Sequence, residues 1–156
     1  MNKQYPGLEA FVKESNLIEG IGAVRKDDIK AHIYLLDQPQ PFVGVLEQFV
    51  RTIRGGPLRQ YEGMDVRIGT YVPRRGGPKI RQRLRELLEM AEHNTLDPWV
   101  LHVNYEKLHP FMDGNGRSGR ALWAWQILNH GHWPKTLEKG FLHPAYYGAL
   151  RYFTRD

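Results

Sequence analysis

The chain contains no cysteine and no apolar run that approaches the roughly 20 residues needed for a membrane-spanning helix. The missing cysteine excludes disulfide bonds, thiolate metal sites and a cysteine nucleophile. The opening, MNKQYPGLEAF, lacks the apolar core of a secretory signal peptide. We therefore expect a cytoplasmic protein that makes no use of a membrane.

The composition is typical of a soluble globular protein, with 41% hydrophobic and 25% charged residues. A length of 156 residues fits one domain covering 1–156. The formal net charge is +5, and one stretch, 73–86, holds six of the basic residues: Arg74, Arg75, Lys79, Arg81, Arg83 and Arg85. Such a stretch can attract a nucleic acid, a nucleotide or an acidic protein, although a solvated helix face is the commoner explanation.

Helical spacing of apolar residues dominates the chain, so we predict an all-α fold. Asp27 or Asp28 is a plausible N-cap, and Gly131 a plausible helix end. The one strand signal, at 64–77, predicts a small β-hairpin. The predicted helices cover 8–14 continuing into 15–21, then 27–37, 42–53, 79–93, 98–108, 116–131 and 143–153.

The stretch HPFMDGNGRSGR, residues 109–120, joins two of the predicted helices. Gly114 and Gly116 allow the backbone to approach a ligand closely, and the free N–H groups of a helix start bind anions. Arg117 and Arg120 lie three apart and project from one side of the first turns. Two guanidinium groups beside a helix start suit a polyphosphate.

The same stretch also carries an acid and an imidazole. Asp113 offers the carboxylate that proteins usually contribute to an Mg²⁺ ion bound to phosphates. His109 has an ordinary pKa of roughly 6.5, suited to a general base near neutral pH. Together with the paired arginines, these groups indicate transfer of a phosphate-containing group to a hydroxyl.

Each of these residues also has a plain structural explanation. A histidine before proline more often ends a helix, Gly-Asn-Gly is common in turns, and an arginine pair at this spacing is usually surface. Phe111 is expected to be a core residue that anchors the loop. The functional interpretation is favoured because all of these features would have to coincide within twelve residues.

The stretch resembles, at every defining position, the signature of Fic-domain proteins. These are small helical enzymes, most of which transfer AMP from ATP to a hydroxyl side chain of a target protein. The likeness extends to 98–111, similar to the helix that leads into the signature, and to 64–77, similar to the flap that pins the target by strand pairing. The stretch AYYGAL, 145–150, is similar to a tyrosine-rich element near the adenine pocket.

The resemblance implies a role for each matching residue. His109 would deprotonate the target hydroxyl, Asp113 would hold Mg²⁺, and Asn115 would contact the α-phosphate. Backbone groups of the two glycines and the side chains of the two arginines would hold the other phosphates. Tyr147, and less clearly Tyr146, would line the pocket for the adenine base. The target-docking flap would consist of Ile68, Gly69, Thr70 and Tyr71.

The stretch SNLIEG, 15–20, resembles the inhibitory motif Ser/Thr-x-x-x-Glu-Gly/Asn of Fic proteins. Ser15, Glu19 and Gly20 match it, within an inhibitory helix placed at 8–22. In the family this glutamate pairs with the second signature arginine, here Arg120, and blocks placement of the γ-phosphate. The resemblance thus implies a weakly active, autoinhibited enzyme, and in some relatives the glutamate also removes AMP from the target.

Alternatives remain at this stage. Relatives move UMP, phosphocholine or phosphate, although the branch that phosphorylates replaces Gly-Asn-Gly with Ala-Asn-Lys. A non-catalytic nucleic-acid-binding module would have no need for the signature residues. A zinc site formed by His130, His132 and His143 is weaker still, because three histidines without a cysteine or nearby acid are usually surface residues. The sequence names neither the target protein nor the oligomeric state, although many relatives self-associate.

Overall fold

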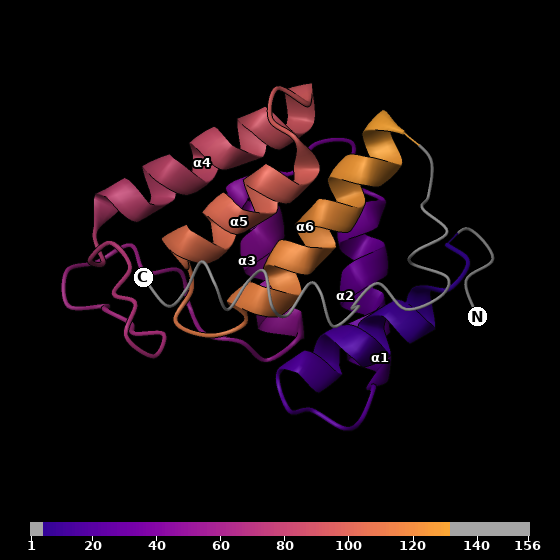
Figure 1. The fold of residues 1–156 in the computed structure, drawn as a ribbon. Helices are drawn as coiled ribbons and strands as arrows, with labels where there is room; N and C mark the ends of the chain where they lie inside the picture. The colour runs from indigo at the N-terminus through magenta and orange to yellow at the C-terminus, as the bar shows by residue number, and fades with distance from the viewer. Residues whose placement is uncertain (1–4, 132–156) are drawn as a thin grey trace.

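A computed structural model describes residues 5–131 of the chain, and within these residues it contains six helices (Figure 1). None of the helices in this part is long and apolar enough to cross a membrane. The helices are α1 Leu8–Ile18, α2 Lys26–Leu36, α3 Val43–Thr52, α4 Pro78–His93, α5 Pro98–Leu108 and α6 Asn115–His130.

The helix α6 lies at the centre of the fold. It packs against α5 and α2 and also contacts α1, α3 and α4, while α4 covers the other side of α5 (Figure 1). Except for Gly116, every residue from Asn115 to Gln126 is buried. A helix that is buried all round needs no polar face, which explains why α6 lacks the one-sided apolar stripe of the surface helices.

The ends of the helices largely follow the sequence pattern. The α5 range agrees with the predicted 98–108, because Asp97 caps it: its Oδ1 accepts hydrogen bonds from the N–H groups of Trp99 at 3.0 Å and Val100 at 3.3 Å. The N-cap of α2 was wrongly expected at Asp27 or Asp28. Arg25 is the N-cap, and Asp28 acts from the third helical position, accepting from the Arg25 N–H at 3.0 Å.

Two predicted helical segments need comment. The expected continuation of α1 through 15–21 is wrong in its last part, since the helix ends at Ile18 and Glu19 is its C-cap. Gly20 has a φ of 75°, a left-handed conformation that ends a helix and that glycine adopts without strain. The predicted helix at 143–153 lies outside the described residues.

The predicted hairpin at 64–77 is only partly formed. Ile68 and Tyr71 make one antiparallel pair, with both N–H···O distances at 2.9 Å, around the Gly69–Thr70 turn. No further strand pairing occurs between the two limbs in the described part of the chain. Pro73 lacks the N–H that a continued ladder would use, which is one physical reason for the short pairing.

We expect His32→Gln to flatten the pH dependence of stability. The His32 ring is buried between Phe11 and Phe49, and burial lowers its pKa to about 4, against about 6.5 in the unfolded chain. The neutral ring therefore contributes its full stability above about pH 6.5, and this contribution is lost as the pH falls toward about 4.

Urea unfolding at about pH 7.5 and about pH 5 tests this expectation. The wild-type protein should lose about 2 kcal/mol more unfolding free energy between these conditions than His32→Gln loses. The exposed His93 supplies the control, and His93→Gln should behave as wild type. Equal losses in wild type and His32→Gln would contradict the expectation.

Candidate active site

The chain reverses sharply between α5 and α6, and the signature residues lie on this reversal. His109 ends α5 with a φ of 51°, and Gly114, with a φ of 93°, is the N-cap of α6. The buried Asn115 side chain holds the turn closed. Its Oδ1 accepts from the Phe111 N–H at 2.8 Å, and its Nδ2 donates to the Phe111 carbonyl at 2.7 Å.

A second segment, 56–60, pairs antiparallel with this loop. Gly56 N–H donates to the Asp113 carbonyl at 3.0 Å, and Met112 N–H donates to the Pro57 carbonyl at 2.9 Å. A Cβ at position 56 would lie 2.7 Å from the Met112 Cβ, so only glycine permits this approach. The Gly55–Gly56 pair therefore lets segment 56–60 lie against the loop.

His109 is positioned as a neutral imidazole. Its Nδ1 lies 3.3 Å from the Glu106 carbonyl, which favours the tautomer with the proton on Nδ1 and leaves Nε2 as the proton acceptor. Burial lowers the pKa of His109, and the charge of Arg59 acts in the same direction. The Glu106 carbonyl and the charges of Glu19 and Asp113 oppose this shift, and burial outweighs them.

The first turn of α6 offers an anion site. The Arg117 residue is only 5% exposed, burial lowers its pKa, and its Nε has no hydrogen-bond partner among the described residues. Asp113 is exposed just before the helix, and its carboxylate takes no hydrogen bond or ion pair from residues 5–131. A buried guanidinium with free donor capacity indicates a place for an anion.

Arg120 is held by the end of α1. Its guanidinium is buried, its Nε donates to Ser15 Oγ at 2.8 Å, and its Nη2 donates to the Ser15 carbonyl at 2.9 Å. The same Nη2 pairs with Glu19 Oε1 at 2.8 Å. The structure thus brings the three residues together although 101 positions separate Glu19 from Arg120.

The Glu19 carboxylate occupies the start of α6. A Cβ added to Gly116 would lie 2.2 Å from Glu19 Oε1, so the carboxylate is in contact with the glycine α-carbon. This is where an anion attracted by the free N–H groups of the helix would bind. Glu19 therefore takes the place of an anion in the arrangement described here.

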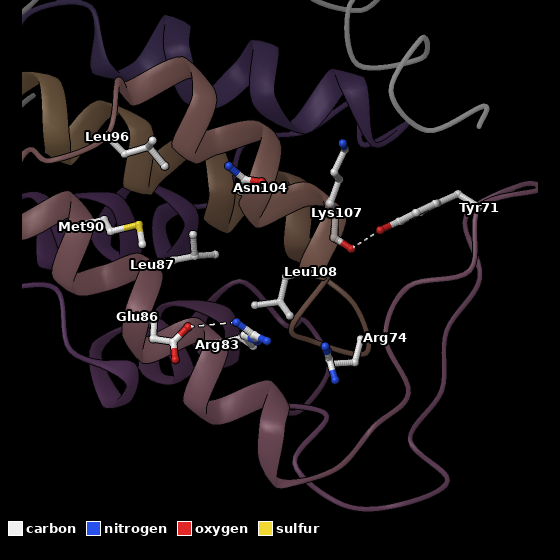
Figure 2. Close-up of a pocket in the computed structure, with 10 residues that line it drawn as sticks. All are labelled: Tyr71, Arg74, Arg83, Glu86, Leu87, Met90, Leu96, Asn104, Lys107 and Leu108. Carbon is white, nitrogen blue, oxygen red and sulfur yellow. Dashed lines mark hydrogen bonds and ion pairs between the residues drawn. The ribbon is translucent and has the colours of Figure 1, made fainter.

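Beside the site lies a groove of about 430 Å³ between α4 and α5. Figure 2 shows Leu87 and Met90 on α4 facing Asn104 and Leu108 on α5. Tyr71 joins the predicted flap to this wall by donating from its hydroxyl to the Lys107 carbonyl at 2.8 Å. The flap residues 68–71 thus lie near the end of α5 that carries His109.

Tyr146 and Tyr147, and two of the three histidines weighed as zinc ligands, lie outside the described residues. In the part of the chain that is described, no group of three histidine or acidic side chains could hold a metal by itself.

Sequence reasoning missed two polar residues next to the site, one largely buried and one fully buried. Burial raises the pKa of Glu106 to about 7, and its Oε1 lies 3.8 Å from His102 Nε2. Arg59 is completely buried and donates to the His109 carbonyl at 2.6 Å. Neither residue belongs to the signature stretch. An arginine directly after a Gly-Gly-Pro-Leu run was the only local signal for the second.

Comparison with known proteins agrees with this arrangement. The family model described as Fic/DOC family matches residues 10–127. The chain is 27% identical over 164 aligned positions to the protein called "Protein adenylyltransferase Fic" of Drosophila grimshawi, and 28% identical to the protein of the same name of Drosophila yakuba. These alignments cover 96% of this chain but only 31% and 30% of the relatives, so the chain spans about a third of their length. The family match covers the helices, the signature loop and the Ser15–Glu19 segment alike, and the chain belongs to the Fic/DOC family.

Proposed function

We propose that this protein is a protein adenylyltransferase that moves AMP from ATP to a hydroxyl side chain of a target protein. One observation carries the proposal: His109, Asp113, Arg117 and Arg120 converge on the first turn of α6. The names of the relatives support the same activity. The relatives' names also support ATP and a protein as the two substrates.

The reaction is a displacement at the α-phosphorus of ATP. Nε2 of His109 takes the proton of the target hydroxyl as the hydroxyl oxygen forms a bond to the α-phosphorus. The bond from this phosphorus to the oxygen that bridges to the β-phosphate breaks, and pyrophosphate leaves. Because His109 is largely buried and neutral, it can accept this proton near neutral pH.

The phosphates would be held by the residues at the start of α6. Arg117 and Arg120 would supply guanidinium groups, and backbone groups of Gly114 and Gly116 would contact the phosphates. Gly116 leaves the room for them, because the atoms nearest to a Cβ at this position belong to Glu19 and Arg120 and not to the apolar core. The Asn115 side chain closes the loop and thereby sets the position of the backbone N–H groups at the start of α6.

A magnesium ion fits the residues present. The exposed carboxylate of Asp113, which has no hydrogen-bond or ion-pair partner among residues 5–131, precedes the helix start. Mg²⁺ is commonly held by one or two carboxylates together with substrate phosphates and water. Asp113 would therefore hold the ion, which when bound neutralises phosphate charge and assists departure of pyrophosphate.

Glu19 acts as the brake in this proposal. It pairs with Arg120 and lies against Gly116, so a triphosphate must displace it to reach both groups. The Glu19 side chain is 38% exposed whereas Arg120 is 1% exposed, so the carboxylate can swing away while the arginine stays in place. Glu19 thereby regulates access of the distal phosphates to Arg120 and does not act on the general base His109.

We expect Glu19→Gly to raise AMP transfer at least about tenfold, because a charge-assisted pair that competes with ATP is removed. The measurement is self-labelling with α-³²P-ATP and Mg²⁺. The control is Asp27→Gly, which removes a different exposed acid, one that lies in the first turn of α2, and should leave transfer at the wild-type level.

Glu19→Gly combined with His109→Ala should abolish the label. Label that persists without His109 would overturn its role as base, and no gain in Glu19→Gly would overturn the brake. If γ-³²P-ATP labels the protein and α-³²P-ATP does not, the protein is a kinase instead.

Ser15→Ala should activate less than Glu19→Gly. It removes the hydrogen bond from Arg120 Nε to Ser15 Oγ but keeps the bond to the Ser15 carbonyl and the ion pair. The loss of one buried hydrogen bond corresponds to a gain of roughly threefold to tenfold in transfer. The same labelling assay ranks the variants, and Ser15→Ala at or below the wild-type rate would show that Ser15 does not support the brake.

A further inference from the structure

Arg59 is a buried cation that donates hydrogen bonds to three segments of the chain. Its Nε donates to the His109 carbonyl at 2.6 Å and its Nη2 to the Leu108 carbonyl at 2.9 Å. Its Nη1 donates to the carbonyls of Met64 at 3.1 Å and Arg74 at 2.8 Å. One guanidinium therefore binds the end of α5 and both limbs of the flap.

The bonds to α5 have a clear physical reason. The last carbonyls of a helix have no partner within it and carry partial negative charge, which a cation stabilises. His109 follows Leu108 in a left-handed conformation, with a φ of 51°, which is uncommon for a residue other than glycine. The two bonds from Arg59 fix the carbonyls on either side of this strained position.

The bonds to the flap act at its base. Met64 begins one limb and Arg74 lies on the other, and Asp65 Oδ1 accepts from the Gly76 N–H at 2.8 Å next to them. With only one strand pair at the tip, Arg59 supplies much of what holds the limbs together. The backbone of Arg59 joins the same unit, because its N–H donates to the Pro110 carbonyl at 2.9 Å and its carbonyl accepts from the Gly77 N–H at 3.0 Å.

We propose that Arg59 is a positioning residue for the transfer reaction, which ties the backbone that carries His109 to the base of the flap. A target segment held by the flap is thereby kept at a fixed distance from the imidazole. The inference rests on the proposed function, since it assigns the flap to the target. Arg59 touches neither substrate nor the His109 ring, and it acts through four backbone carbonyls.

The kinetic test compares Arg59→Lys with the parent, both carrying Glu19→Gly. Lysine keeps the charge but cannot reach four carbonyls with a planar fork. We expect the rate of self-labelling at saturating ATP to fall at least about tenfold, because small misplacements of reacting groups are costly. The KM for ATP should change by less than about twofold, since no phosphate contact is altered.

Gln126 provides the matched control. It is fully buried, and its Nε2 donates to Asn94 Oδ1 at 2.9 Å and to the Leu96 carbonyl at 2.8 Å, at the other end of α6. Gln126→Leu should lower the melting temperature as Arg59→Lys does but keep the transfer rate. If the two variants lose equal transfer at equal loss of stability, Arg59 is a structural residue only and the proposal is overturned.

Hydrogen exchange tests the link without any activity. In Arg59→Lys, amide exchange should rise in 64–76 and in 109–113 together, relative to Gln126→Leu. Asp65→Ala keeps the Arg59 side chain but removes the exposed carboxylate that accepts from Gly76 and attracts Arg59. It should loosen the flap base and, through Arg59, 109–113 as well. If Arg59→Lys does not fold, Asp65→Ala alone tests whether Arg59 links the flap base to 109–113.

A rise confined to one of the two segments, in either variant, would overturn the proposal. The outcome is separable from that of the proposed function. If Glu19→Gly transfers no AMP, the proposed activity fails, while the exchange data still show whether Arg59 joins the flap to the His109 backbone.

Discussion

The reversal of the chain between α5 and α6 is the constraint on which the site depends. The loop that joins these two closely packed helices must also orient the His109 imidazole and leave the N–H groups at the start of α6 accessible. Asn115 closes this loop on Phe111, and the 56–60 segment pairs with its outer edge. Because both devices use backbone groups, the loop shape is fixed independently of the exposed side chains around it.

Electrostatics explains why a carboxylate from the start of the chain belongs at this place. Arg117 and Arg120 are both buried, and a buried cation is costly unless an anion or several acceptors compensate it. Ser15 and Glu19 provide that compensation for Arg120. Under the proposed function a triphosphate would take over this compensation, so the stability of the resting protein and the affinity for ATP would both depend on Arg120.

The sequence was informative wherever a pattern is local. The range of α5 was predicted to the residue because Asp97, Pro98 and the apolar spacing all agree. The Glu19–Arg120 pair was expected from the resemblance to the family motif and not from a local pattern, and the two side chains do form an ion pair. A longer hairpin was expected at the flap than the structure shows. Alternating apolar residues do not reveal that the strand pairing stops after Ile68 and Tyr71. The cap of α2 was misplaced because Asp28 stabilises the helix start from the third helical position, and the local sequence does not distinguish this role from that of an N-cap.

The sequence by itself determined the helical class, because this follows from the spacing of apolar residues. The candidate AMP-transfer chemistry of residues 109–120 and the candidate brake at 15–20 came from the resemblance of these stretches to motifs of the Fic family. Only the tertiary structure decided that Arg59 joins the His109 backbone to the flap, that position 56 must be glycine for the loop between α5 and α6 to approach, and that the Glu19 carboxylate lies against Gly116. Such contacts join residues far apart in the chain. Their geometry arises from packing, which no local pattern encodes.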